Sequence, residues 1–326
     1  MTPIIFNKAD KGYEELKALL GYFDAQFNFE ALIPDIEQQT PLLINYIGKE
    51  AYLTALYHYD ADKAPEGFTP IADKDDLQNA IVKQMQTYII TMAALNYMQS
   101  GDLEHTNSGR KQNRTDNQVT PWEWQLDRDN AAHLKRAYRA LDMLIAYLDE
   151  LNHESWTDSD AYKKSRSLFI YKTQILDDIY PINNSGQLYY RMVPLMADHE
   201  IESIYPLIGS TKYTELKGII EGNTEADISL ENKVLLNHIR KAITYLTMAD
   251  AYDMLPVEMF PDKVEYNMKP KDFTAVWEEK VQRLRDKAQL HLRNVEQQYA
   301  IINMTTATVA RDPLSGLNEE NNHVSL

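Results

Sequence analysis

The stretch LINYIGKEAYLTAL, residues 43–56, recurs in outline as SIYPLIGSTKYTEL, residues 203–216. A glycine inside a helix costs about 1 kcal/mol relative to alanine, so a repeated one indicates a use. We expect each glycine to end a helix or to admit a closely packed backbone, in preference to acting as a hinge. The shared pattern is Ile-Gly-x-x-x-Tyr, and its glycines and tyrosines are Gly48, Tyr52, Gly209 and Tyr213.

Further matches follow in the same order along the chain. Apolar residues at helical spacing occur in any amphipathic helix, so one match alone carries little weight. Several matches in one order indicate an internal duplication. The paired stretches are IIFNK (4–8) with LFIYK (168–172), FEALIPDIEQ (29–38) with YYRMVPLMAD (189–198) after one residue of slippage, TYIITMAAL (87–95) with ITYLTMADA (243–251), and Ala137, Leu141, Leu144 and Leu148 with Ala288, Leu292, Val295 and Tyr299.

The duplication predicts a mainly α fold of two tandem modules, each with about three main helices, long loops between helices and at most minor β content. We place the first module at residues 1–151, a linker at 152–165 and the second module at 166–303. Residues 304–326 show no periodicity and are expected to be a disordered or docking tail. Tyr52 and Tyr213 are expected to be buried against the third helix of their own modules.

Helix start signals support this division. Thr120, Pro121 and Glu123 have the spacing of an N-cap, a first helical position and a capping box. Ser229 and Asp272 are further N-cap candidates. The sequence TDSD at 157–160 predicts a short helix in the linker, while IIF and LFIY are short apolar runs that suit paired strands. The main helices are expected at 34–56, 75–99 and 122–151, and at 185–220, 230–254 and 272–300.

Each module carries a long connection between its second and third helices, at 100–120 and at 256–271. Connections of this length between packed helices are unusual and are often functional. The first one holds a compact basic run, Arg110, Lys111 and Arg114. This run is either a solvated loop or a contact for an acidic partner or nucleic acid.

Composition excludes several classes of protein. The chain has no cysteine, so disulfides and thiolate metal sites are excluded. No run of 18 apolar residues predicts a membrane span, and the N-terminus does not match a signal peptide. The net charge of −16 opposes strong nucleic-acid binding. We therefore expect no membrane partner and no strong nucleic-acid binding, although a local basic patch is compatible with this charge.

No motif predicts catalysis or a cofactor. Phosphate-binding glycine loops and the Gly-x-Ser-x-Gly elbow are absent from the sequence. A helical di-iron site needs Glu-x-x-His on two helices; ELNH (150–153) lies at a helix end and ENNH (320–323) in the tail. Asp198, His199 and Glu202 share a helix face, but the other module supplies no matching histidine. We expect no metal, no cofactor and no enzymatic activity.

A resemblance rests on LIPDIEQQTPLLINYIGKEAYLTAL, YPINNSGQLYYRMVPLMADHEIESIYPLIG and AITYLTMADAYDMLPVEM. These stretches resemble an uncharacterised helical family encoded in Bacteroidetes genomes and their phage-like gene clusters, and the resemblance covers roughly residues 28–300. More distantly, an Ile-Pro pair followed by Ile-Gly-x-x-x-Tyr is similar to small head–tail connector proteins of tailed phages. Those proteins form rings between the portal and the tail.

The resemblance implies a non-enzymatic structural or assembly protein, as a head–tail connector or neck-ring component. Its partners would be portal or tail proteins and further copies in a homo-oligomeric ring, in the virion or the cytoplasm. An acidic lining would repel passing DNA. A connector module is usually single, whereas this chain has two, which changes the expected number of chains per ring. The alternatives are a cytoplasmic helical adaptor and an enzyme with a dispersed site.

Overall fold

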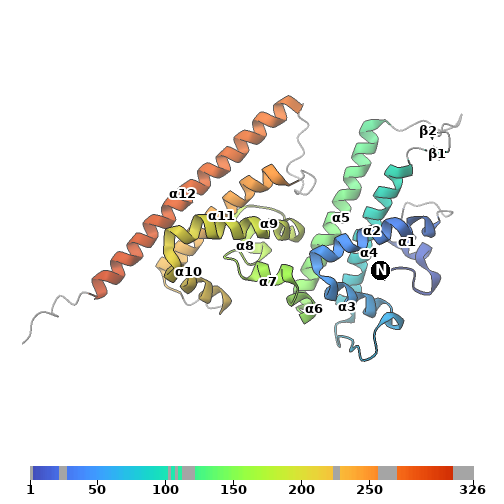
Figure 1. Cartoon of the computed structure of the whole chain (residues 1–326), viewed down its shortest axis with the longest axis horizontal. Helices are drawn as coiled ribbons and strands as arrows, with labels where there is room; N and C mark the ends of the chain where they lie inside the picture. The colour runs from blue at the N-terminus through green and yellow to red at the C-terminus, as the bar shows by residue number, and fades with distance from the viewer. Residues whose placement is uncertain are drawn as a thin grey trace, which may run out of the picture. The chain divides into compact units, whose positions relative to one another are not determined.

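The chain is mainly α-helical, as predicted, and divides into two compact units (Figure 1). The first unit lies within Met1–Arg166 and Lys172–Val193, and the second within Ser167–Tyr171, Pro194–Leu255 and the C-terminal helix. The computed structural model describes residues 3–21, 28–101, 104–106, 109–111, 122–222, 228–255 and 270–310.

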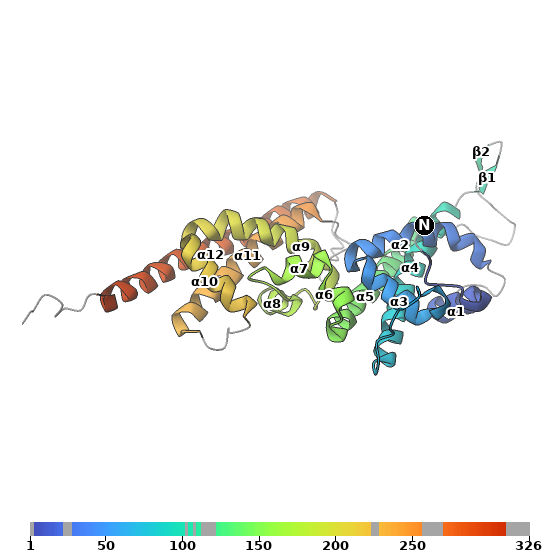
Figure 2. The same cartoon turned by 60° about the horizontal axis from the view of Figure 1, so that its bottom comes forward.

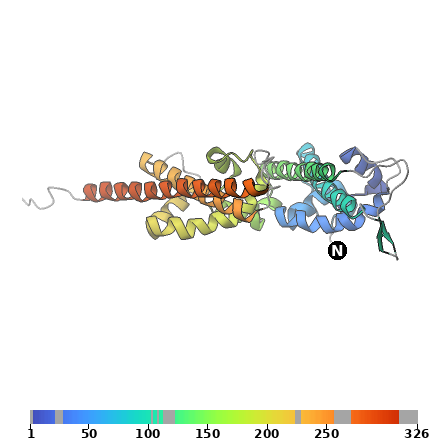
Figure 3. The same cartoon turned by 90° about the horizontal axis from the view of Figure 1, so that it is seen from above.

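Two long helices, α4 and α5, form the centre of the first unit. α4 packs along α5, and α2 and α3 pack on α4 (Figures 1 and 3). The 3-10 turns η1 (Lys8–Asp10), η2 (Phe29–Leu32) and η3 (Ala61–Lys63) connect these elements. The helices are α1 (Gly12–Leu20), α2 (Ile33–Ile47), α3 (Lys49–Tyr59), α4 (Asp75–Gly101), α5 (Glu123–Leu151), α6 (Glu154–Thr157), α7 (Asp160–Arg166), α8 (Thr173–Ile179) and α9 (Gly186–His199), whose first half belongs here.

The predicted apolar stripe of α5 faces this core. Ala137, Leu141, Leu144 and Leu148 are all buried, because residues three and four apart lie on one helix face. The indole nitrogen of the fully buried Trp156 donates to Asp149 Oδ1 at 2.8 Å and so holds α6 against the end of α5.

The second unit continues α9 through a π-helical turn (Glu200–Ile204) into α10 (Tyr205–Glu221), followed by α11 (Leu230–Met254) and α12 (Pro270–Ala310). α11 lies along α12 (Figure 2). Ser229 caps α11, since its side chain accepts a hydrogen bond from the backbone N–H of Asn232 at 3.3 Å, as predicted.

A two-stranded antiparallel hairpin lies in the predicted loop between α4 and α5. Its strands are β1 (Glu104–Thr106) and β2 (Gly109–Lys111), with Glu104 opposite Lys111. The prediction that the IIF and LFIY runs form strands is wrong. Both runs lie in irregular backbone in the structure.

The predicted helix bounds change at several places. The single helices expected at 34–56 and 185–220 are each interrupted. α5 begins at Glu123, where the backbone N–H of Trp122 donates to Gln125 Oε1 at 2.9 Å. The predicted cap Thr120 lies outside the described residues. α12 begins at Pro270, before the predicted cap Asp272.

The module boundaries predicted at 151 and 165 do not coincide with the compact units, because Lys172–Val193 belongs to the first unit. The division into modules therefore stays a prediction. α12 reaches Ala310, so residues 304–310 are helical where we expected a tail. Most of the loop at 256–271, and the tail from residue 311 on, lie outside the described residues.

Candidate functional site

The two glycines of the repeated pattern share one unusual backbone conformation. Gly48 has φ 83° and ψ 157°, and Gly209 has φ 69° and ψ 167°. This region is essentially restricted to glycine, because a Cβ would clash with the backbone. Each glycine interrupts a helical run, so the first predicted role, ending a helix, is confirmed for α2 at Gly48.

Tyr52, four residues after the first glycine, is fully buried. Its hydroxyl donates to the backbone carbonyl of Pro3 at 2.8 Å. Burial raises the pKa of this phenol far above its usual value. The hydrogen bond ties α3 to the N-terminal segment, and the burial predicted for Tyr52 is confirmed. Packing of Tyr52 against the third helix stays a prediction.

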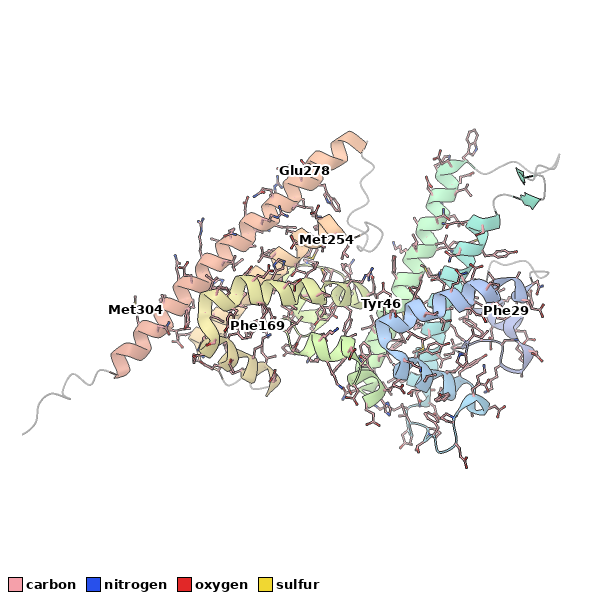
Figure 4. All side chains as sticks on the ribbon, viewed as in Figure 1. Phe29, Tyr46, Phe169, Met254, Glu278 and Met304 are labelled. Carbon is pink, nitrogen blue, oxygen red and sulfur yellow. The ribbon has the colours of Figure 1, made fainter. Side chains whose placement is uncertain are left out.

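Tyr213, four residues after the second glycine, is only half-buried, which corrects the prediction of burial for this residue. Its ring centroid lies 5.4 Å from that of Phe169 (labelled in Figure 4) and 5.4 Å from that of Tyr205. Its hydroxyl donates to Glu200 Oε2 at 3.3 Å. Burial first, and the Glu200 carboxylate second, raise the pKa of Tyr213.

Each unit also holds one irregular apolar segment by its backbone carbonyl. In the first unit, Gln86 Nε2 of α4 donates to the carbonyl of Ile5 at 2.8 Å. In the second unit, Arg240 Nε of α11 donates to the carbonyl of Phe169 at 2.9 Å. Ile5 and Phe169 are both fully buried and occupy the same place in the matched runs IIFNK and LFIYK.

The π-helical turn places Glu200 in the interior of the second unit. Its carboxylate accepts hydrogen bonds from the backbone N–H of Phe169 and from Lys217 Nζ. Burial raises the pKa of Glu200 and lowers that of Lys217, while their mutual attraction opposes both shifts. A buried pair of this kind fixes a conformation more than it adds stability. It anchors Phe169 beside Tyr213.

This turn also accounts for the one-residue slippage between the two copies of the pattern. A π-turn inserts one residue into an α-helix. The second copy has one residue more than the first between its proline (Pro194) and its glycine (Gly209), and the turn lies between them. In the first copy, α2 runs from Pro34 to Gly48 without such an insertion.

A groove of about 620 Å³ opens beside Gly48 in the first unit. A Cβ placed on Gly48 would lie 3.1 Å from Cβ of Ser159, so the glycine lets this side chain approach closely. Close packing of a backbone, the second role predicted for this glycine, stays a prediction. Lys163 Nζ lies 2.9 Å from Asp158 Oδ1 and offsets that charge. The groove is lined by Ile44, Asn45, Gly48, Lys49, Glu50 and Thr54 on one side and by residues of His153–Ala161 on the other.

The ends of α4 and α5 carry the predicted interaction loop. Arg110 and Lys111 lie in β2, while Arg114 lies outside the described residues. Beside the loop, Trp122 is 68% exposed and Trp124 is 59% exposed. Sequence reasoning took TPWEW only as a helix start and missed these exposed tryptophans. The signal was present, since two large aromatics stood beside a polar loop that contains a basic run.

The ends of these two helices lie at the margin of the core. From Glu123 to Ala132, α5 contains no buried residue, and α4 contains none from Asn96 to Gly101. Tyr97 and Met98 of α4 still pack against the edge of the core, whereas Trp122 and Trp124 at the start of α5 are exposed. The tip, defined as Asn96–Gly101, the hairpin and Trp122–Ala132, therefore presents two exposed tryptophans beside the connection that contains the basic run.

The histidines and acids do not gather into a metal centre. Within the described part of the chain, no group of three or more His, Asp or Glu side chains is placed to hold a metal ion. His199 Nε2 lies 3.0 Å from Asp250 Oδ2. His238 Nδ1 of α11 lies 3.1 Å from His291 Nδ1 of α12. Such a pair shares one proton when both rings are neutral.

Asp142 of α5 is a carboxyl group whose pKa is strongly raised in the folded protein. It accepts hydrogen bonds from Ser185 Oγ at 3.0 Å and from the backbone N–H of Gln187 at 2.9 Å, at the start of α9. Burial raises its pKa to about 6, against the lowering effect of these bonds. The arrangement is that of a helix cap, and no second titratable group stands beside it in the described contacts.

These features define a mainly α-helical protein with a repeated glycine break and an exposed aromatic tip. The chain belongs to the DUF6712 family, a family of unknown function, whose profile matches residues 39–166 and 204–297. No curated protein and no solved structure matches the chain. Among the described helices, none has the length and apolarity needed to cross a membrane.

Proposed function

We propose that this chain is a non-enzymatic assembly protein of a phage-like particle, built from two copies of one helical module and acting as a head–tail connector or neck-ring component. The observation that carries the assembly role is the exposed pair Trp122 and Trp124 at the tip of α4 and α5. Tryptophan and arginine dominate binding energy at protein interfaces, so this tip has the composition of a contact surface.

The basic run in the connection between α4 and α5 suits another copy of the same protein. Arg110, Lys111 and Arg114 lie in its connection, while the whole chain has a net charge of −16. A basic run that docks on an acidic patch of a neighbour makes a contact between unlike surfaces, and such contacts close into rings when the rotation allows it. The same negative charge repels DNA that passes through a ring.

Two local features that recur in both units support the two-module construction. Gly48 and Gly209 share one glycine-only conformation, and the carbonyls of Ile5 and Phe169 are both held by a side chain of a long helix. The finer assignment to a neck ring rests on the resemblance of the Ile-Pro and Ile-Gly-x-x-x-Tyr pattern to connector proteins. It places the protein in the virion or, before assembly, in the cytoplasm.

The test removes the tip without touching the core. Deletion of residues 104–117 should leave the melting temperature nearly unchanged, because loop-closure entropy depends weakly on loop length. Trp122→Ser with Trp124→Ser should do the same. Both changes should abolish self-association in light scattering and co-assembly with a portal or tail protein.

A matched control is Leu42→Ser, which removes a residue of α2 that is 47% exposed in the same unit. This control should assemble normally. The proposal is wrong if the tip variants assemble like the unaltered protein. It is equally wrong if the unaltered protein neither self-associates nor joins portal or tail proteins.

A further inference from the structure

The contact between α11 and α12 carries a group of basic side chains. His238 Nδ1 lies 3.1 Å from His291 Nδ1, and Tyr245 stacks on His291. Lys287 Nζ lies 5.3 Å from the ring centroid of Tyr245. Lys241 follows His238 by one turn of α11, and its charge acts on both histidine rings. We call His238, Lys241, Lys287 and His291 the seam cluster.

The positive charges of the seam cluster are not balanced within the described part of the chain. Neither Lys241 nor Lys287 has an ion pair there. Burial lowers the pKa of His291 most, and the neighbouring charges that add to this effect are all positive. Like charges held together oppose one another. The folded chain therefore keeps an uncompensated cationic site, although its net charge is −16.

Two acids that are near the seam cluster in sequence are engaged elsewhere. Asp286, next to Lys287, accepts a hydrogen bond from Gln282 Nε2 at 2.9 Å. Asp250 Oδ2 of α11 lies 3.0 Å from His199 Nε2. Neither carboxylate acts on the pKa of His238 or of His291.

The first unit has buried apolar residues where the second has most of this group. The comparison uses the proposed duplication and extends the matched stretches of α4 with α11 and of α5 with α12. The counterparts of His238, Lys241, Tyr245 and His291 are Val82, Met85, Ile89 and Ala140. Packing of two long helices is thus achieved in the first unit without titratable groups at these places, so packing alone does not account for the seam cluster.

Lys287 has a basic counterpart, but that counterpart has a partner. Arg136 of α5 takes its place, and the Arg136 guanidinium donates to the backbone carbonyl of Leu19. Lys287 has no such acceptor among the described residues and is exposed. Its ammonium group is therefore open to a ligand from solvent.

We infer that the seam cluster is a binding site for a small oxyanion with two negative charges, of the phosphate and sulfate class. One proton added to the pair keeps the hydrogen bond between the two Nδ1 atoms and gives each ring an N–H donor at Nε2. With the two ammonium groups, these donors suit a ligand with more oxygens than a carboxylate has. The site is separate from the tip and does not depend on the assembly role.

Protonation of the pair and binding of the anion should strengthen each other. The bound anion opposes the repulsion that disfavours a charged ring, and binding couplings are reciprocal. Sulfate is the better probe, because it keeps both of its charges from about pH 5.5 to pH 8, whereas phosphate titrates near pH 6. A pH dependence of sulfate binding then belongs to the protein.

Sulfate titration followed through the imidazole NMR signals tests the site, with chloride holding the ionic strength constant. The signals of His238 and His291 should shift saturably. Half-saturation should need about tenfold less sulfate at pH 5.5 than at pH 8, which corresponds to a rise of about one unit in the pKa of the pair. His153, in the first unit, is the internal control and should not respond.

A pair of matched double variants identifies the lysines. Lys241→Gln with Lys287→Gln should raise the half-saturating sulfate concentration about tenfold, because two charge-assisted contacts are lost. Lys49→Gln with Lys83→Gln removes the same charge from exposed positions of the first unit and should leave binding unchanged. Both variants keep the two histidines, so the same signals report binding in each.

The inference is overturned if the histidine signals do not saturate, if binding is independent of pH, or if the two double variants bind sulfate equally. A short DNA duplex at the same phosphate concentration should bind no better than sulfate. Tighter binding of the duplex, lost with Lys241 and Lys287, would overturn the small anion and assign the site to a nucleic-acid backbone. Light scattering reads assembly separately, so the proposed function can fail while this site stands.

Discussion

The hydroxyl of Tyr52 donates a 2.8 Å hydrogen bond to the carbonyl of Pro3, and so joins α3 to the first described residues of the chain. Tyr52→Ala should cost about 3 kcal/mol of unfolding free energy, as for a large buried aromatic. Tyr52→Phe should cost about 1 kcal/mol, since it removes only the hydrogen bond. Tyr213→Ala should cost less than Tyr52→Ala, because Tyr213 is half-buried. Urea unfolding measures all three, and equal losses at the two tyrosines would contradict this ranking.

The two glycines should tolerate alanine unequally. Both substitutions force a Cβ into a glycine-only region of backbone space, at a cost of about 1–3 kcal/mol. Gly48→Ala adds a close contact with Ser159, whereas the described surroundings of Gly209 leave room. Gly48→Ala should therefore lower the melting temperature more than Gly209→Ala. Gly67→Ala, at a glycine with positive φ in a surface turn, is the control that measures the backbone cost without a close contact.

Thr91 and Thr247 occupy the same place in the matched Thr-Met-Ala sequences, and both are fully buried. Among the described atoms, neither hydroxyl has a hydrogen-bond partner. A buried, unsatisfied hydroxyl costs about 1–3 kcal/mol. Valine has nearly the same shape, so Thr91→Val and Thr247→Val should each raise stability by about 1 kcal/mol in denaturant unfolding. A loss of stability in both would show that each hydroxyl is satisfied in solution.

Asp142 should make stability fall as the pH rises. Burial raises its pKa from 3.8 to about 6, so the folded state keeps a proton that the unfolded state has lost. Stability is therefore lost between about pH 4 and pH 6. Asp142→Asn removes this dependence, and its gain over the unaltered chain should grow by about 2–3 kcal/mol across the window. Asp127→Asn, at an exposed position of α5, should show no such gain.

The pair His238 and His291 should make stability fall as the pH drops, which is the opposite of the effect of Asp142. Burial lowers the pKa of both, and Lys241 beside both and Lys287 beside His291 add to the effect. Tyr245 stacks on His291 with ring centroids 5.7 Å apart. The folded state then binds fewer protons than the unfolded state, so stability falls as the pH drops below about 6.5.

Replacing one ring tests this assignment. His291→Gln should flatten the decline in thermal stability between pH 6.5 and pH 5, because it removes one titrating group and the repulsion between two charged rings. His153→Gln, in the first unit, is the control. The assignment is contradicted if the two variants show the same slope of melting temperature against pH as the unaltered chain.

The long helices could be predicted from the sequence because their signals are local. Ala137, Leu141, Leu144 and Leu148 repeat at helical spacing, and each is buried in the structure. Ser229 caps α11 because a side-chain oxygen needs to reach only the N–H groups of the next turn. The helix breaks at Gly48 and Gly209 could be anticipated for the same reason.

The contacts between residues that are far apart in the sequence could not be predicted in this way. LFIY shows a strand pattern, yet its carbonyl at Phe169 is held by Arg240, which lies far along the chain. Glu200 looks like an ordinary surface acid, and only the π-turn places it beside Lys217. Trp122 and Trp124 look like core residues and are exposed, because they lie at the start of α5, well before the first buried residue of that helix, His133.

The sequence by itself therefore determined the helical class, the long helices and the repeated glycine, since these depend on neighbours within a few residues. Only the tertiary structure decided which apolar residues are buried, which charges are paired and which glycine is covered. Burial, charge pairing and cover depend on which side chains from distant parts of the sequence pack against each residue. Gly48 and Gly209 have one conformation, and their difference in exposure comes from Ser159, which packs against Gly48 in the first unit.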